Sequence, residues 1–216
     1  MKTKVPYIPN LESIPYDALC DIMEKRGRRE YVANAPWPEF PYKPIVAVDL
    51  AADDDYLFVR FFVRGLGLKA EFDKTNEPVW QDSCVEMFIE DQDGGGYRNI
   101  EVNCIGTLLS SHQKEKGVDV KRIGEEDERK IIRISSLPAH TFKEKDGVHE
   151  WTMIIGIPFS LLGYKERPES LRANFYKCAD GSRYPHYLCW SPIHTPSPNF
   201  HLPEFFGTLN LESPKA

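Results

Sequence analysis

The 216-residue sequence lacks features that would assign it to several common classes of protein. No apolar run approaches the roughly 20 residues of a membrane-spanning helix, so we expect no membrane partner. The formal net charge is −6, and the basic residues of "EKRGRRE" and "EEDERK" alternate with acidic ones. Because nucleic-acid binding depends on clustered lysine and arginine, the composition also argues against DNA or RNA as a partner.

Cysteine pairs with metal-binding or disulfide spacing are missing as well. An odd number of cysteines without a CxxC pair favours free thiols over a disulfide framework or a zinc knuckle. The histidines have no HxxxH spacing, so no metal ligands are predicted from them. The five cysteines are Cys20, Cys84, Cys104, Cys178 and Cys189, and the C-terminal histidines are His186, His194 and His201.

The first ten residues, "MKTKVPYIPN", contain neither the apolar segment nor the cleavage site of a signal peptide. If this N-terminus is native, the unpaired cysteines agree with a cytoplasmic protein. A signal peptide trimmed from the sequence would instead place the protein in the periplasm or outside the cell.

Long amphipathic helices are scarce. Apolar spacing predicts one helix in "SIPYDALCDIMEKRG", with Ser13 as its cap and Gly27 as its end, and a helical turn at "PFSLLG". About ten short segments between Gly, Pro, Asp and Asn clusters have the composition of β-strands, and the missing helices between them exclude a parallel α/β sheet. We therefore predict an all-β fold, a two-sheet antiparallel β-sandwich of the jelly-roll or immunoglobulin-like type, over residues 31–216. An N-terminal extension with a short helix precedes it over residues 1–30.

Two predicted strands, "CVEMFIED" and "YRNIEVNC", flank the turn sequence "DQDGGGY" and should form an antiparallel pair. If their alternating apolar residues face the core, Glu86, Glu101 and Asn103 share the opposite face. Depending on register, Glu86 lies across from Glu101 or Asn103, with Cβ atoms about 5 Å apart. Two carboxylates at this distance need a cation, calcium, sugar hydroxyls or a shared proton, unless both extend into water.

Aromatic residues flank this carboxylate face. The turn "QDS" can fold Trp80 back over the sheet toward Glu86. Tyr187 and Trp190, in the C-terminal third, are candidates for a second aromatic platform. Aromatic rings bind the C–H face of a sugar while carboxylates and amides bind its hydroxyls, so this combination is typical of a glycan-binding surface.

Several segments of the chain occur together in a known family. They are Trp37, "PVWQDSCVEMFIE", "IEVNCIGTL", "EWTMIIGIPFSLLG", "RANFYKC", "CWSPI" and "FHLPEFFGTLNLE". From about residue 31 to residue 212 the sequence resembles the family 9 carbohydrate-binding modules of the DOMON-like superfamily, in a free-standing bacterial version. The resemblance implies a β-sandwich that holds the end of a glycan chain between two aromatic rings, often with a structural calcium ion.

Three site residues follow from this resemblance by position. Trp80 is similar to the first tryptophan of the family's site, Glu86 to its acidic hydrogen-bonding partner and Trp190 to the second tryptophan. The family pattern has an arginine where this sequence has Glu101, which implies a different pocket charge and a different sugar preference.

The leading prediction is a non-catalytic carbohydrate-binding protein that requires no cofactor. Its predicted ligand-binding residues are Trp80, Glu86, Glu101, Asn103, Tyr187 and Trp190. The first alternative is a glycoside hydrolase with Glu86 and Glu101 as acid and base, which a face open to water would disfavour. The second is a sandwich without a sugar ligand, either an interaction domain or a haem protein. Haem needs an axial His or Met, whereas Met87 is predicted to face the core. The sequence indicates no oligomeric state.

Overall fold

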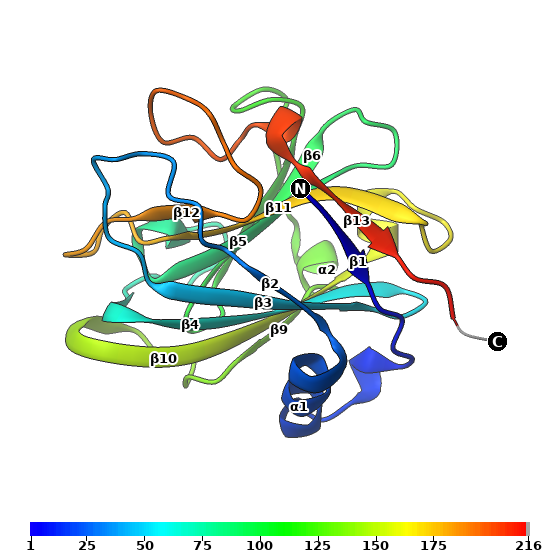
Figure 1. Ribbon diagram of the computed structural model, residues 1–216, viewed down its shortest axis with the longest axis horizontal. Helices are drawn as coiled ribbons and strands as arrows, with labels where there is room; N and C mark the ends of the chain where they lie inside the picture. The colour runs from blue at the N-terminus through cyan, green and yellow to red at the C-terminus, as the bar shows by residue number, and fades with distance from the viewer. Residues whose placement is uncertain (215–216) are drawn as a thin grey trace.

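Two β-sheets pack face to face in the computed structural model, which describes residues 1–214 (Figure 1). The first sheet has the strand order β1 (Lys2–Val5), β13 (Gly207–Leu211), β11 (Ser170–Cys178), β5 (Cys84–Glu90), β6 (Tyr97–Asn103), β7 (Leu108–Gln113) and β8 (Lys121–Arg122), with β12 (Tyr187–Cys189) paired to β11. The second has the order β2 (Arg28–Tyr31), β3 (Ile45–Ala52), β4 (Tyr56–Ala70), β10 (Phe142–Pro158) and β9 (Ile132–Ser135). The predicted all-β sandwich is confirmed.

The main hydrophobic core lies between the two sheets. Val85, Met87 and Ile89 of β5 point into it and are fully buried, as their alternation predicts. They pack with apolar residues of the second sheet, such as Phe61 of β4 and Met153 of β10. Because Met87 belongs to this core, its thioether cannot serve as an axial ligand in an outward-facing haem pocket.

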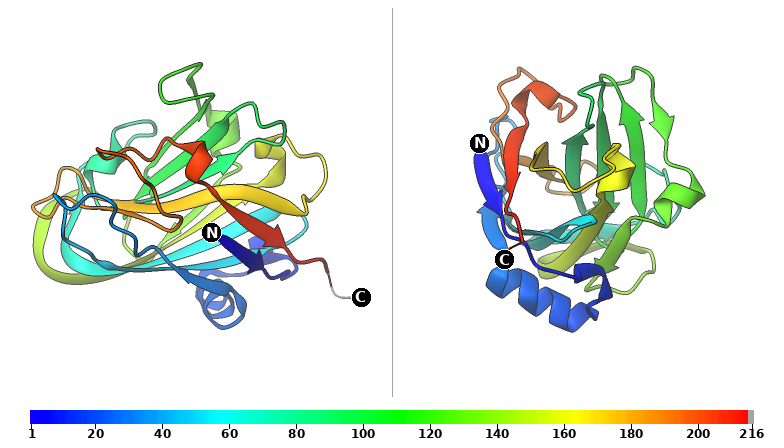
Figure 2. Two further views of the ribbon diagram at one scale, coloured as in Figure 1. Left: turned by 45° about the horizontal axis from the view of Figure 1, so that its top comes forward. Right: turned by 90° about the vertical axis from the view of Figure 1, so that its right-hand side faces the viewer.

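The predicted N-terminal helix is α1 (Tyr16–Arg26), which lies against the outer face of the second sheet (Figure 2). Leu19 and Met23 are buried there against Phe58 and Ile154. The helix begins later than predicted, because Ser13 belongs to the 3-10 turn η1 (Leu11–Ser13) and Pro15 precedes the first helical residue. Gly27 follows the last helical residue, as expected.

The remaining helical segments are short. The turn predicted at "PFSLLG" is η3 (Phe159–Leu162), which ends at Gly163 with a φ of 87°. The others are η2 (Val79–Gln81), α2 (Glu125–Glu128) and η4 (Pro203–Phe205). None of the helices within residues 1–214 combines the length and apolar character that crossing a bilayer requires.

The first 30 residues contribute to both sheets. Strand β1 pairs in parallel with β13, and β2 pairs with β3. Neither strand was predicted, since the sequences KTKV and RREY are mostly polar and too short to show a clear alternation. The boundary proposed at residue 31 stays a prediction about domain limits, but the segment before it is integral to the sandwich.

The outer face of the first sheet is covered. A second hydrophobic cluster places Phe88 and Tyr176 of this sheet under Trp37, Phe200 and Phe206, which come from the connecting segments. The ring of Phe200 stacks on that of Tyr176 at 4.2 Å between centroids. The expectation that this face is open to water is therefore wrong, because long loops fold back over it.

Gly207 offers a test of the packing at the start of β13. A Cβ atom there would overlap the indole of Trp190, whose Cη2 would lie 2.7 Å away, and Trp190 is fully buried. We expect Gly207→Ala to lower the free energy of unfolding by about 1–3 kcal/mol, since neither the ring nor the strand has room to move. Urea denaturation measures this value.

The control is Gly95→Ala, because a Cβ at Gly95 meets no atom within 4 Å. Equal stability of the two variants would contradict the packing described here.

Candidate ligand-binding site

A cavity of about 340 Å³ opens on the covered face of the first sheet. Its floor comes from the middle strands and includes Glu86 of β5, Glu101 of β6 and Cys178 of β11. Trp80 and Phe200 line it from the connecting segments. The central strands thus supply acidic and thiol groups, while the loops supply aromatic rings.

Glu86 and Glu101 lie directly opposite each other. The register of β5 and β6 makes them partners, and both are nearly inaccessible to solvent, at 3% and 4% exposure. The Cys178 thiol donates to Glu86 Oε1 at 3.0 Å, and Asn99 Nδ2 donates to Glu101 Oε1 at 2.7 Å. The predicted shared face is confirmed, with Glu101 rather than Asn103 across from Glu86.

Burial changes the protonation of this pair. Desolvation raises the pKa of Glu101 to about 7. Desolvation, followed by repulsion from Glu101, raises the pKa of Glu86 well above its ordinary value. Two adjacent buried carboxyls do not both ionise near neutral pH, so the pair retains a proton.

Other charged groups surround the pair. Asp180 lines the same cavity, and burial raises the pKa of its carboxyl to about 6. Its Oδ1 atom is buried without a hydrogen-bond partner. Lys116 and Arg122 also line the cavity, and the charge of Arg122 partly offsets the rise in the Glu101 pKa.

Trp80 lies on η2, beside the acidic floor. Asp180 N donates to Trp80 O and Gly181 N donates to Gln81 O, each at 3.1 Å, so the turn after β11 holds η2 in place. The buried carboxylate of Asp82 accepts from Glu71 N at 2.9 Å and fixes the preceding loop. Trp80 remains 37% exposed. The predicted folding of Trp80 back toward Glu86 therefore agrees with the structure, which places both at one cavity.

Trp190 does not lie at this site, and its assignment as a second platform is corrected. It is fully buried between the sheets, packs against Phe175 at 5.5 Å between ring centroids, and its Nε1 donates to Glu30 at 3.4 Å. The physical reason is the alternation of side chains along β12, which continues into Trp190, the residue directly after the strand, so that residues 187 and 190 face opposite sides. Tyr187 faces the cavity, so Trp190 faces the core.

Tyr187 and Phe200 are the further aromatic residues that the structure brings to the cavity. Tyr187 is half-buried, with its ring against Phe40 at 4.7 Å between centroids. Trp37 is buried against both Tyr187 and Phe200, and its Nε1 donates to Thr195 O at 3.0 Å. Trp37 therefore supports the loop rather than lining the cavity.

Asn103 is also corrected as a ligand contact. It is fully buried, and its Nδ2 donates to Phe72 O at 2.8 Å and to Asp82 Oδ2 at 3.0 Å. Its Oδ1 accepts from Thr107 N at 2.9 Å. Its amide is thus occupied in holding loops together, and Asn99, on the same face of β6, lines the cavity instead.

Several cavity residues were missed by sequence reasoning. Asp180, Lys116, Arg122 and His201 come from turns or from the short β8, where no periodicity indicates which way a side chain points. Desolvation lowers the pKa of His201 to about 4, and a 2.8 Å hydrogen bond joins its Nδ1 to the Tyr97 hydroxyl. Its imidazole is therefore neutral in the folded protein.

The family model of carbohydrate-binding family 9 matches residues 18–211. The chain belongs to carbohydrate-binding family 9. A family 9 assignment agrees with a sandwich whose first sheet carries an aromatic and polar cavity. No curated protein sequence matches the chain.

Solved structures resemble this family 9 protein at two levels. A crystal structure from Bacteroides uniformis ATCC 8492, provisionally described as a carbohydrate-binding protein, has 29% identity and a TM-score of 0.92, and the match covers 98% of this chain and 99% of that one. Structures of a family 9 module from Caldicellulosiruptor kristjanssonii, with glucose and with cellotriose, have 15% and 14% identity and TM-scores of 0.62 and 0.61. These matches cover 100% of this chain and 97% and 95% of the modules, and they show a shared fold.

The raised pKa of Glu101 predicts a pH-dependent stability. Between the ordinary glutamate pKa of about 4.3 and the folded value of about 7, the unfolded chain loses the proton that the folded chain retains. Glu101 therefore lowers the free energy of unfolding as the pH rises through this window, and the loss is complete above it. We expect Glu101→Gln to gain about 1–3 kcal/mol relative to the parent protein between pH 5 and pH 8.

Urea denaturation of the parent and of Glu101→Gln at pH 5 and at pH 8 measures how the stability difference between them changes with pH. The carbonyl oxygen of the substituted amide would still accept from Asn99 Nδ2, so the Glu101→Gln variant removes mainly the ionisation. The exposed Glu166, changed to Gln, is the control and should show no such gain. A stability difference for Glu101→Gln that is the same at both pH values would contradict burial of an ionisable carboxyl.

Proposed function

We propose that the protein binds the end of a glycan chain in the cavity between Trp80 and the Glu86–Glu101 pair, without catalysing a reaction on it. The observation that carries the proposal is the partly exposed indole of Trp80 beside a floor of buried carboxyls. The volume of about 340 Å³ falls at the lower end of the range of ligand pockets, about 300–1,000 Å³. This size suits one or two sugar units rather than a long segment of polysaccharide.

The cavity offers both kinds of contact that a sugar needs. The C–H face of a pyranose ring packs on the Trp80 indole, while its hydroxyls bind the polar floor. Because Glu86 and Glu101 retain a proton between them, the pair can both donate to and accept from sugar hydroxyls. Lys116 and Arg122 add donors.

Family membership supports binding without turnover. A water-exposed pair of carboxylates would disfavour a glycoside hydrolase, but Glu86 and Glu101 are buried on a covered face, so their environment does not exclude acid–base chemistry. The non-catalytic proposal therefore depends on the family, and the test below includes a measurement of turnover. A structural calcium ion remains a prediction from the family resemblance, and no step of the proposal requires it.

Trp80→Ala should weaken glycan binding by about tenfold or more, because 1.4 kcal/mol of lost ring packing corresponds to a factor of ten. Isothermal titration calorimetry with glucose and cellotriose measures the effect, since family 9 modules of the same fold hold these sugars. A wider glycan array extends the search if both sugars fail. Tyr31→Ala is the control, because Tyr31 is 59% exposed and does not line the cavity.

Two results would overturn the proposal. One is the absence of binding to every glycan by folded protein. The other is release of product from an aryl glycoside or oligosaccharide that disappears in both Glu86→Gln and Glu101→Gln, which would identify a hydrolase instead.

A further inference from the structure

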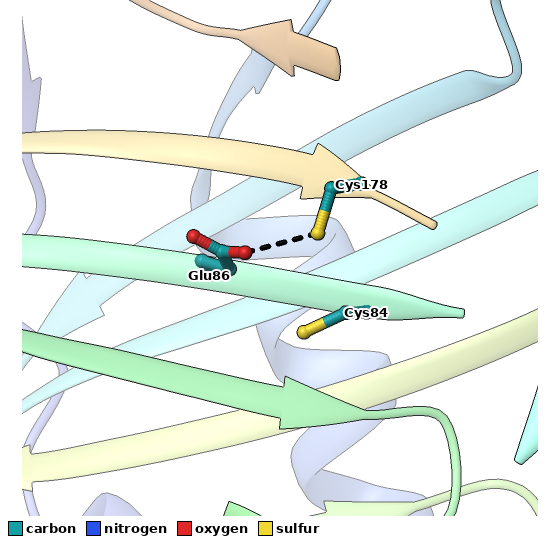
Figure 3. Close-up of side chains that lie close together, drawn as sticks. All are labelled: Cys84, Glu86 and Cys178. Atoms are coloured by element: carbon teal, nitrogen blue, oxygen red, sulfur yellow. Dashed lines mark hydrogen bonds between the residues drawn. The ribbon is translucent and has the colours of Figure 1, made fainter. Parts of the chain in front are cut away.

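Three potential metal ligands meet at the floor of the cavity. Cys84 and Glu86 are two residues apart on β5 and point to the same face, and Cys178 lies directly across from Cys84 on β11. Figure 3 shows the two thiols and the carboxyl converging on one another. The β5–β11 pairing joins Glu86 to a cysteine 92 positions away in the sequence, which is why the search for CxxC spacing did not reveal this cluster.

The distances suit a small tetrahedral ion. One ligand atom from each of the three residues lies within 4.8 Å of the other two, and Cys178 Sγ is 3.0 Å from Glu86 Oε1. Around zinc, with Zn–S near 2.3 Å and Zn–O near 2.1 Å, such ligand atoms are about 3.6–3.8 Å apart. Small rotations of the side chains would therefore produce a three-ligand zinc site.

We propose that Cys84, Cys178 and Glu86 bind one zinc ion, with the fourth coordination position directed toward the cavity. Glu86 and Cys178 line the cavity, so an ion can reach the cluster from solvent. Three protein ligands with water or substrate in the fourth position is the arrangement of open zinc sites of the catalytic type, whereas structural zinc sites have four protein ligands.

Beside the cluster, one carboxyl oxygen of Asp180 is buried without a hydrogen-bond partner. Asp180 lines the same cavity and its charge acts on both Cys178 and Glu86, while its Oδ1 is buried without a hydrogen-bond partner. A zinc-bound water offers such an acceptor a donor. This unpartnered oxygen is an observation independent of the three ligands.

Binding of zinc to this cluster is coupled to the release of protons. Zinc is bound by thiolates and carboxylates, so the two buried thiols and the buried carboxyl must lose their protons when the ion binds. Binding of zinc forms two Zn–S bonds and one Zn–O bond and releases the two thiol protons, together with the Glu86 proton, to solvent. No oxidant or reductant is consumed.

The donor set selects among metals. Two thiolates favour zinc or copper(I), and the carboxylate shifts the preference toward zinc. Calcium requires a larger set of oxygen ligands, so this cluster does not suit it. Cys84 and Cys178 lie opposite each other, which would also suit a disulfide between the two strands. A disulfide would not account for the Glu86 carboxyl, which accepts a hydrogen bond from the Cys178 thiol.

Glu86 belongs to both proposals, but the zinc proposal is argued from the position of the three ligands and does not require a bound glycan. The experiment uses the full chain, reduced and freed of metal. Cobalt(II) is added first as a spectroscopic probe, and we expect one equivalent to bind with thiolate-to-cobalt absorption in the near ultraviolet. Added zinc should displace the cobalt, and dialysed protein should retain one zinc per chain by elemental analysis.

Three variants identify the ligands. Cys84→Ser, Cys178→Ser and Glu86→Gln should each weaken zinc binding by at least about tenfold. Cys104→Ser is the matched control, since Cys104 is equally buried but outside the cluster, and it should bind zinc as the parent does. Circular dichroism checks that each variant is folded.

A second measurement needs no variant. Zinc should slow the alkylation of Cys84 and Cys178, but not that of Cys104, as mapped by mass spectrometry. The proposal is overturned if reduced protein binds no cobalt or zinc at equimolar concentration, or if Cys104→Ser weakens binding as much as Cys84→Ser does. Calorimetry with sugars in the presence of a chelator tests the proposed function separately, so the two can fail independently.

Discussion

The position of β5 between β6 and β11 is the constraint on which the site depends. The pairing of β5 with β6 places Glu86 across from Glu101, and the pairing of β5 with β11 places Cys84 across from Cys178. Because side chains alternate along a strand, a shift of one residue would send these groups into the core and bring Met87 to the surface. The apolar face of β5 therefore fixes the polar face, and core packing determines the chemistry of the cavity.

The aromatic residues that cover the first sheet determine the protonation of the carboxyls beneath them. Carboxyls on an uncovered sheet would be hydrated and ionised, whereas here Trp37, Phe200 and Phe206 exclude water from the same face. Removing this apolar surface from water stabilises the fold by roughly 25 cal/mol per Å² and offsets the cost of burying polar groups. The loops that enclose the cavity are thus also what raises the pKa values on its floor.

The sequence was sufficient to predict side-chain orientation where the two-residue alternation of a strand determines it. The alternation in β5 and β6 predicted which residues face the core and which pair of carboxyls meets. Sequence reasoning failed for Trp190, because Trp190 and Tyr187 are three positions apart and an extended backbone directs them to opposite faces, Trp190 into the core. It also failed for Asn103, since the sequence does not show which end of a strand is covered by a loop. Asp180 and the cysteine cluster required knowledge of which strands become neighbours.

The four residues of β1 protect the flank of the first sheet. Without them, β13 would present its unpaired backbone groups to any other extended chain, which is how sheets associate edge to edge. The strand is short and exposes Lys2 and Lys4, and like charges oppose further strand addition. Thr3 donates to Glu30 of β2 at 2.6 Å, which ties this flank to the opposite sheet. Strand β1, whose sequence does not predict a strand, thereby helps to prevent the sandwich from polymerising through the backbone hydrogen bonds of its sheet edge.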